Sequence, residues 1–238
     1  MSRTAVVIGV GPGLGLSVAH RFGREGYAVA LVSRSANRHA DYVASLADKG
    51  IRAEPFTADV HDRAQLEATL DAIETRLGAP DLLYYGPGAR DLDAPRPGGI
   101  TQTTSEEVRE AMAGVHPAID AVNRVLPGMV SRGTGSLLFA GGLSSVVPMP
   151  FLGALALSSA ALRTYAVTLN AGLTGTGVYA GTLTIGALIA RGDIHRYVAS
   201  NPEQYGDVSP RTLDPDDIAD TAWLLTVERD RAEEVVTL

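Results

Sequence analysis

The residues from Thr4 to Val18 read TAVVIGVGPGLGLSV, and this stretch decides the fold. Its apolar run AVVI is typical of a strand that is covered on both faces. The glycine-rich string from Gly9 to Gly15 follows, and a helix is expected directly after it. Glycines permit a tight turn and let the backbone approach a pyrophosphate, which the N–H groups and dipole of the helix N-terminus then favour. The stretch predicts a dinucleotide-binding loop; a tight turn without a ligand is the alternative.

Outward from this loop, strand-like and helix-like segments alternate to the end of the chain. Strands are expected at 4–9, 28–32, 52–57, 81–85, 136–140, 178–184 and 234–238, and helices at 13–26, 37–49, 63–77, 104–132, 152–173 and 215–227. A Pro/Gly-rich loop is expected at 91–99. The alternation predicts an α/β fold of the Rossmann type, a doubly wound parallel sheet with helices on both faces. We expect one domain over 1–238.

Composition excludes several function classes. The 238 residues carry a net charge of −7 without acidic or basic blocks, so we expect neither nucleic acid nor a membrane as partner. No apolar run reaches the roughly 20 residues of a membrane span. There is no cysteine, which excludes disulfides, thiolate metal sites and thiol nucleophiles. The five histidines are scattered, so no metal site is expected. Without cysteine or a leader-like N-terminus, a cytoplasmic location is expected.

The end of the second expected strand predicts which cofactor binds. Enzymes that prefer NAD usually carry an acidic residue here, which binds the ribose hydroxyls. This chain has Ser33 and Arg34 instead, with Arg38 four residues on. Because a guanidinium donates paired hydrogen bonds to phosphate, we expect NADP(H) to be favoured over NAD(H). The alternative is that Arg34 is a surface residue that faces water.

With these motifs in place, the sequence resembles the short-chain dehydrogenase/reductase family over essentially its whole length. The family's glycine loop, its acidic residue after the third strand and its strand-four motif appear as 8–15, Asp59 and 81–88. Leu126-Pro127 is also typical, and Ile185-Gly186 stands at the nicotinamide-binding motif. The resemblance implies a seven-stranded sheet, homodimers or homotetramers, and a mobile lid near 190–210. The cofactor-binding residues it implies, with those above, are Gly9, Gly11, Pro12, Gly13, Leu14, Gly15, Ser33, Arg34, Asp59, Val60, Tyr85, Gly86, Pro87, Ile185, Gly186 and Leu188.

The family's catalytic residues are not found at the matching positions. The family uses Asn, Ser, Tyr and Lys, whose positions fall here on Gly114, Gly142, Leu155 and Ser159. A shift of the alignment does not restore the motif, because Lys49 is the only lysine and Ser45 stands four residues before it. The chain therefore lacks the tyrosine and lysine that supply the family's proton.

Three residues are candidates for replacement chemistry. Ser144 follows the fifth strand, although a turn serine that bonds its own backbone is the commoner case. Tyr85 ends the fourth strand, where it contacts the cofactor or fills the space of the missing Asn. His195 lies in the expected lid and either supplies a proton when the lid closes or has no role. An apolar pocket is expected from Val146, Val147, Pro148, Met149, Phe151, Leu155 and Leu188, which suits a bulky apolar small-molecule substrate.

Three functions remain open from the sequence. The first is an NADP(H)-dependent oxidoreductase that reduces a carbonyl, imine or activated alkene with a non-standard proton donor. The second is a non-redox cyclase or isomerase of specialised metabolism. The third is a catalytically silent nucleotide-binding regulator or subunit, and the fold alone does not choose among them.

Overall fold

The computed structural model describes residues 3–88, 98–205, 207 and 209–238. Most of the loop expected at 91–99 therefore lies outside the described residues. The strands are β1 (Arg3–Ile8), β2 (Tyr27–Ser33), β3 (Ala53–Thr57), β4 (Pro80–Tyr85), β5 (Gly135–Gly142), β6 (Val178–Ile185), β7 (Leu188–Ile189), β8 (Thr212–Leu213) and β9 (Glu233–Val236). The helices are α1 (Leu14–Arg24), α2 (His39–Ala47), α3 (Arg63–Leu77), α4 (Ser105–Met112), α5 (His116–Arg132), α6 (Ala154–Gly172), α7 (Asp193–Ala199), α8 (Pro202–Tyr205) and α9 (Pro215–Glu228).

Seven strands form one parallel sheet in the order β3-β2-β1-β4-β5-β6-β9, which confirms the expected fold class. The strand order reverses between β1 and β4, because β1 pairs with β2 on one side and with β4 on the other. In doubly wound sheets, ligands bind outside the carboxyl ends of the strands at such a reversal. The sheet therefore places the glycine loop, which follows β1, at the expected ligand position.

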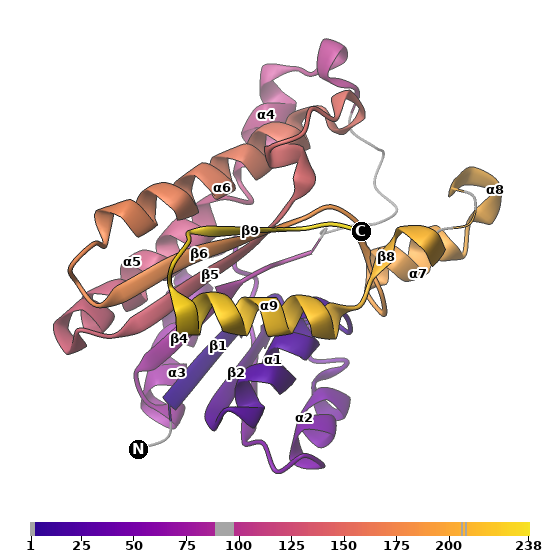
Figure 1. Cartoon of the computed structure of the whole chain (residues 1–238). Coiled ribbons are helices and arrows are strands. Elements are labelled where there is room, and N and C mark those ends of the chain that lie inside the picture. Colours follow the sequence, from indigo (N-terminus) through magenta and orange to yellow (C-terminus); the bar gives the residue numbers. More distant parts are fainter. Residues whose placement is uncertain (1–2, 89–97, 206, 208) are drawn as a thin grey trace.

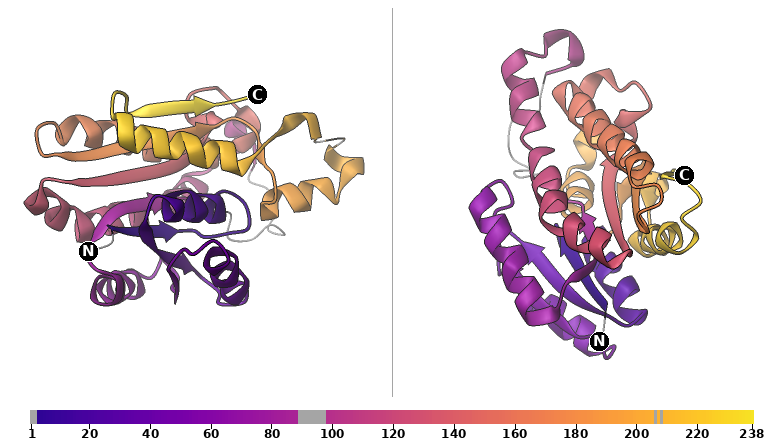
Figure 2. Two further views of the ribbon diagram at one scale, coloured as in Figure 1. Left: turned by 60° about the horizontal axis from the view of Figure 1, so that its bottom comes forward. Right: turned by 90° about the vertical axis from the view of Figure 1, so that its left-hand side faces the viewer.

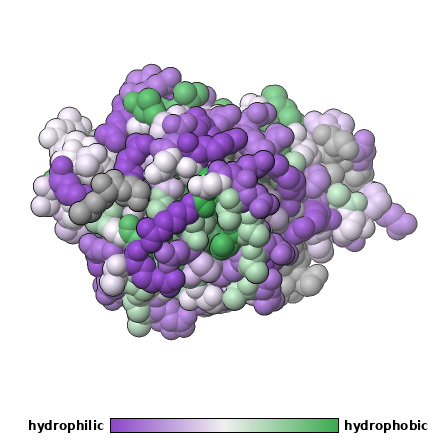
Figure 3. Space-filling model, turned by 90° about the horizontal axis from the view of Figure 1, so that it is seen from below, coloured by the Kyte–Doolittle hydropathy of each residue, from purple (hydrophilic) through white to green (hydrophobic). Residues whose placement is uncertain are grey.

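Side chains alternate between two cores, one on each face of the sheet. Val6 and Ile8 belong to one buried cluster, and Ala5 and Val7 belong to the other. Helices α3, α5 and α6 cover the first face, and α1, α2 and α9 cover the second (Figures 1 and 2). The strands read as continuous apolar runs because both of their faces are buried. Seen from below, the outer surface is mostly hydrophilic with small separate apolar areas (Figure 3).

The single helix expected at 104–132 is wrong, because two helices occupy this stretch. Helix α4 begins with a capping box made by Thr104 and Glu107, and α5 begins at His116. Between them, the N–H groups of Gly114 and Val115 donate to carbonyls only three residues back. Pro117 lacks an N–H group, and its ring conflicts with the carbonyl four residues earlier. The backbone of Gly114 is thus exposed at a break.

A small second sheet was not expected. Strands β7 and β8 pair in parallel and flank the segment that carries α7 and α8. Figures 1 and 2 show α7 and α8 beyond the carboxyl edge of the main sheet. Among the described helices, none is both long enough and apolar enough to span a bilayer.

Candidate functional site

A cavity of about 720 Å³ lies at the carboxyl edge of the sheet, above the reversal between β1 and β4. Five loops contribute to it: those after β1, β2, β3, β4 and β6. It is deep enough for a large ligand, since sites for small molecules and cofactors span roughly 300–1,000 Å³. Its position and size fit a dinucleotide that lies across the edge of the sheet.

The glycine loop forms one wall of this cavity. Gly9 has a φ of +92°, and a Cβ atom there would lie 2.6 Å from the backbone of Gly86. A Cβ atom on Gly15 would lie 2.6 Å from the Gly9 carbonyl oxygen, so helix α1 packs directly on the loop. At Gly11, by contrast, an added Cβ has no neighbour within 4 Å among the described atoms, although Gly11 lines the cavity. Gly9 and Gly15 therefore shape the loop, whereas Gly11 leaves room for a ligand.

The start of α1 is arranged to receive an anion. Within the described part of the chain, no side chain caps this helix at Gly13. The cavity is lined by Gly13, Leu14 and Gly15, whose backbone N–H groups belong to the first helical turn. N–H groups in the first turn of a helix carry partial positive charge. Such a turn favours the binding of an anion such as a pyrophosphate.

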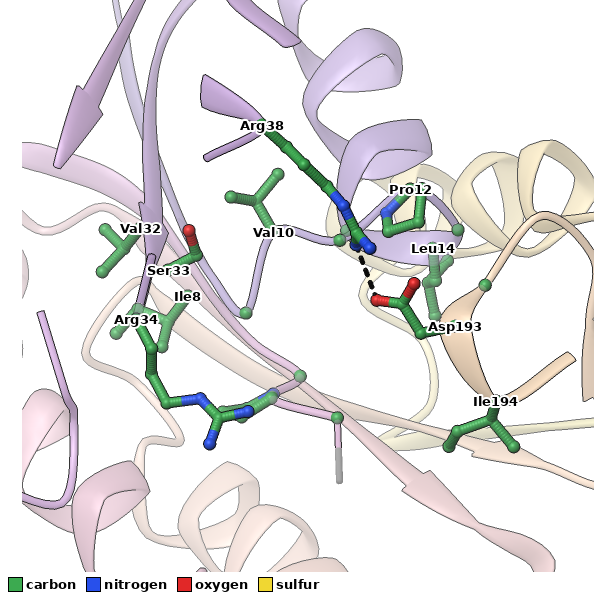
Figure 4. Close-up of a pocket in the computed structure, with 18 of the residues that line it drawn as sticks. Ile8, Val10, Pro12, Leu14, Val32, Ser33, Arg34, Arg38, Asp193 and Ile194 are labelled. Carbon is green, nitrogen blue, oxygen red and sulfur yellow. Dashed lines mark hydrogen bonds and ion pairs between the residues drawn. The ribbon is translucent and has the colours of Figure 1, made fainter. Parts of the chain in front are cut away.

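Two arginines reach the cavity from the segment between β2 and α2. Arg34 and Arg38 both line it; in Figure 4 the Arg38 side chain extends toward Pro12 and Asp193, whereas Arg34 lies beside Ser33 and Ile8. The neighbouring Ser33 hydroxyl lies 2.7 Å from Nε2 of His39, an imidazole whose pKa is lowered by burial. No acidic residue from the end of β2 lines this part of the cavity. The arrangement provides positive charge where a ribose phosphate would lie.

An acidic residue of the expected lid segment faces Arg38. The Arg38 guanidinium donates to the Asp193 carboxylate at 2.7 Å, so that α7 is joined to the start of α2 across the cavity (Figure 4). The Arg38 hydrogen bond holds the pKa of Asp193 below its usual range. Beside this pair, a Cβ atom on Gly13 would lie 3.0 Å from Cα of Gly192. The lid segment thus lies against the glycine loop.

Most of the residues predicted to bind the cofactor line this cavity. They are Gly9, Gly11, Pro12, Gly13, Leu14, Gly15, Ser33, Arg34, Val60, Gly86, Pro87 and Leu188. Sequence reasoning missed Tyr42, His61 and Ile194, which also line it. Tyr42 is buried on α2 whereas Ile194 is exposed on α7, and no local motif marks either position.

Four of the residues expected at the cofactor are not among those that line the cavity, and their role at the cofactor stays a prediction. Asp59 turns toward its own backbone, where its carboxylate accepts from the His61 N–H group at 3.1 Å. Ile185 ends β6, and the N–H group of the following Gly186 donates to the Val236 carbonyl of β9. The cavity is lined by the three residues that follow directly, Ala187, Leu188 and Ile189. The fourth position is Tyr85.

Tyr85 points into the core between the sheet and α5. It is 3% exposed, and its hydroxyl donates to the Gly114 carbonyl at 2.9 Å. This carbonyl is available because the helix breaks at Gly114. Burial raises the pKa of Tyr85. Its proton is therefore engaged and hard to release. The Tyr85 hydroxyl lies at Gly114, the position of the missing Asn, and contact of Tyr85 with the cofactor stays a prediction.

The family's other catalytic positions lie together between β5 and α6. Gly142 ends β5, and Leu155 lies in the first turn of α6 with 45% of its side chain exposed. Ser158 donates back to the Leu155 carbonyl, as helix serines often do. Ser144 lies in the short turn Leu143–Ser145, where a Cβ atom on Gly142 would be 3.8 Å from its hydroxyl oxygen. Ser144 and Gly142 are thus neighbours.

No lysine lies on α6. Lys49, the only lysine, follows α2, on the face of the sheet opposite α6. The first cationic residue after Ser159 on α6 is Arg163, whose Nε donates to Glu233 of β9 at 2.6 Å. Thr184 also donates to Glu233 at 2.6 Å. Arg163 is therefore held at β9 and does not replace a lysine beside the site.

The remaining candidates lie at the rim. His195 is half-buried in α7, in the expected lid. Of the residues expected to form an apolar pocket, Leu188 lines the cavity, whereas Val146, Val147 and Phe151 are exposed, Phe151 by 70%. The apolar pocket is thus an exposed apolar surface in this structure, next to Leu155.

Comparison with known proteins assigns this architecture. The family profile described as short chain dehydrogenase matches residues 3–192. The chain is 28% identical over 190 residues to a short chain dehydrogenase of Pseudocercospora fijiensis, covering 78% of this chain and 60% of the relative. It is 30% identical over 161 residues to 2,3-dihydro-2,3-dihydroxybenzoate dehydrogenase of Bacillus subtilis, covering 67% of this chain and 59% of the relative. The chain thus spans about three fifths of the length of these relatives.

Solved structures share the fold. L-sorbose reductase from Gluconobacter frateurii, complexed with NADPH and L-sorbose, superimposes with a TM-score of 0.84 at 21% identity, covering 99% of this chain and 95% of that one. An NADPH-bound short chain oxidoreductase from Pseudomonas aeruginosa PAO1, described as containing an atypical catalytic center, gives 0.82 at 22% identity, covering 98% and 94%. At this identity the similarity concerns the fold.

Proposed function

The chain belongs to the short chain dehydrogenase family, and on this premise we propose that it is an NADP(H)-dependent oxidoreductase with a non-standard proton donor. The observation that carries the proposal is the cavity at the sheet reversal, where a glycine loop faces Arg34 and Arg38. A guanidinium beside the ribose position favours the additional phosphate of NADP(H). The NADPH complexes described for the two structural neighbours agree with this choice.

The nicotinamide cofactor supplies a hydride, and the chain supplies orientation and charge. We propose that Gly11 and the first turn of α1 hold the pyrophosphate, that Arg34 and Ser33 hold the ribose phosphate, and that Leu188 packs beside the nicotinamide. Reduction of a carbonyl also requires one proton at the oxygen. Because Tyr85 is buried and bonded to Gly114, we assign proton delivery to water or to His195 of the lid.

The substrate we propose is a bulky, largely apolar small molecule that contains a carbonyl, imine or activated alkene. The exposed apolar side chains of Val146, Val147, Phe151 and Leu155 support this proposal. Leu155 stands at one of the family's catalytic positions, and a substrate that covered these side chains would bury apolar surface. The cytoplasmic location and the homodimer or homotetramer stay predictions.

One observation favours a second function, a nucleotide-binding protein without turnover. Gly142 and Leu155 carry no side-chain group that could donate a proton, and Tyr85 at the end of β4 is buried in the core. Such a protein would bind NADPH and act as a regulator or a silent subunit. A non-redox cyclase or isomerase would use the same pocket and would turn over a substrate without consuming NADPH.

End-point assays with deuterated NADPH distinguish these functions. The protein is incubated with NADPH that carries deuterium at the transferred position and with a panel of apolar ketones, imines and enones. An oxidoreductase transfers the deuterium to the product, which mass spectrometry detects. Product without deuterium identifies a non-redox enzyme, and binding of NADPH without any product identifies the silent protein.

A further inference from the structure

A second cavity, of about 320 Å³, lies on the other side of Pro12 from the dinucleotide cavity. It is enclosed by α1, the C-terminal end of α2, the start of the lid and the start of α9. We propose that it is a binding site for a small, multiply charged anion that carries a phosphate group. This proposal does not rest on the proposed oxidoreductase function, because the two cavities share only Pro12.

Charge is the first argument. Arg24, Lys49 and Arg191 line this cavity, and Asp216 is the one carboxylate among the described residues that line it. The three cations come from α1, from the turn after α2 and from the turn after β7, so no single amphipathic helix explains their convergence. The chain as a whole carries a net charge of −7, and its only lysine lies here. Positive charge is therefore concentrated at this cavity, although the net charge of the molecule is negative.

The hydrogen-bond donors of the cavity are the second argument. Among the residues that the structure describes, neither Arg24 nor Lys49 makes a side-chain hydrogen bond or ion pair. Arg191 is bonded to Asp214 and Asp216, both at 2.9 Å. An oxyanion that accepted from Arg24 and Lys49 would satisfy donors that the protein leaves to solvent. A guanidinium and an ammonium on one cavity are suited to phosphate.

His20 is a built-in reporter for this cavity. Its Nε2 lies 3.1 Å from the Ser45 hydroxyl. The pKa of His20 is lowered, first by burial and then by Arg24, with Lys49 and Arg191 acting in the same direction and Asp216 opposing them. The three cations thus act on one imidazole. A bound anion would offset their field and would raise the pKa of His20.

The backbone of the lid links the two cavities. Arg191 has a φ of +65°, which is uncommon for a residue other than glycine. It precedes Gly192, whose Cα lies against Gly13 of the glycine loop. The Arg191 guanidinium, at the second cavity, and the Gly192 backbone, at the first, are thus adjacent in the chain. An anion that drew Arg191 away from its carboxylates would act on the segment that lies on the glycine loop.

The test uses thermal unfolding of the whole chain with inorganic phosphate, against sodium chloride at matched ionic strength. At ten times the dissociation constant, we expect phosphate to raise Tm by about 3–5 °C. Because the dinucleotide cavity also suits phosphate, two double variants are compared. Arg24→Gln with Lys49→Gln removes two exposed cations from the second cavity. Arg34→Gln with Arg38→Gln removes the same charge from the dinucleotide cavity.

The proposal expects the Tm shift to be lost in the first double variant and kept in the second. It is overturned if the wild-type chain shows no shift beyond that of chloride, if the first variant keeps the shift, or if both variants lose it equally. A second readout is the imidazole signal of His20 by NMR, assigned with His20→Gln. Phosphate should raise the pKa of this signal, and an unchanged pKa overturns the proposal. In a parallel experiment, glycerol phosphate replaces inorganic phosphate. A Tm shift at lower concentrations of glycerol phosphate would assign a phosphorylated metabolite as the ligand.

Discussion

The two halves of the sheet differ in what they retain of their family. On the side of β1, β2 and β3, the glycine loop has the backbone that a pyrophosphate requires, and Arg34 and Arg38 reach the cavity. On the side of β5 and α6, glycine, leucine and serine stand at the positions where the resemblance places catalytic side chains. Sites for binding and for proton transfer are therefore separable within one fold. We expect this protein to bind its nucleotide as the family does and to handle the proton differently.

The largest effect is expected from restoring the family's four catalytic side chains in the half of the molecule around β5 and α6. The variant combines Gly114→Asn, Gly142→Ser, Leu155→Tyr and Ser159→Lys. The backbone has room at both glycines, where an added Cβ would lie 3.4 Å and 3.8 Å from its nearest neighbours. Because a positioned general acid contributes about 10²–10⁴-fold, NADPH-dependent reduction of a simple ketone should rise by that factor.

The control for this variant has Leu155→Phe in place of Leu155→Tyr, which keeps the ring and removes the hydroxyl. It should show no gain. If the full variant binds NADPH and keeps its Tm but shows no increase in turnover, the assignment of these four positions is wrong.

The next largest effect tests the half of the sheet that carries the glycine loop. Gly11→Leu fills the cavity, since a side chain there meets no protein atom within 4 Å. Affinity for both NADPH and NADH should fall by at least about 100-fold, the cost of a few lost interactions, with little change in Tm. Gly141→Leu is the matched control, because its Cβ is equally unobstructed but Gly141 does not line the cavity. Equal losses in both variants would show that the cavity is not the nucleotide site.

Arg34→Ala should affect one nucleotide only. Removing a charged hydrogen bond costs about 1.5–3 kcal/mol, so affinity for NADPH should fall by about 10–100-fold while that for NADH stays the same. Arg52→Ala is the control, because Arg52 is also exposed and lies away from the cavity, where it pairs with Glu54 of β3. Fluorescence titration of the nicotinamide measures both. A parallel loss for NADH would remove Arg34 as the selectivity residue.

The smallest effect concerns the lid. Asp193→Asn removes a carboxylate that competes with the ribose phosphate for Arg38. Exposed ion pairs contribute about 0.2–1 kcal/mol, so affinity for NADPH should rise by roughly threefold. In an Arg38→Ala background the same substitution should have no effect. An equal gain in that background would mean that Asp193 acts on the nucleotide directly.

The sequence predicted the sheet and the glycine loop because both depend on local patterns. Apolar runs reveal strands that are buried on two faces, and the loop between β1 and α1 requires glycine at fixed positions. The break at Gly114 was missed, although Pro117 supplies its cause, because helical propensity on both sides is strong. A proline in the first turn of a new helix and a proline inside a long helix look alike in one sequence.

The contacts across the cavity could not be predicted in this way. Arg38 and Asp193 are 155 residues apart, and only the folded chain brings the start of α2 to the lid. The direction of Tyr85 depends on which face of β4 is covered by α5, which period-two alternation alone does not say. Local pattern thus predicts the elements and the loop, whereas long-range packing decides which side chains meet.

Calorimetric titration of the purified chain with NADPH, and with NADH for comparison, tests the central claim most directly. The account predicts that NADPH binds at one site per chain, with an affinity at least about tenfold higher than that of NADH, because Arg34 and Arg38 face the ribose phosphate. Absence of binding by either nucleotide would contradict the claim that the glycine-loop half is a working site, and equal binding of both would contradict the role of the arginines.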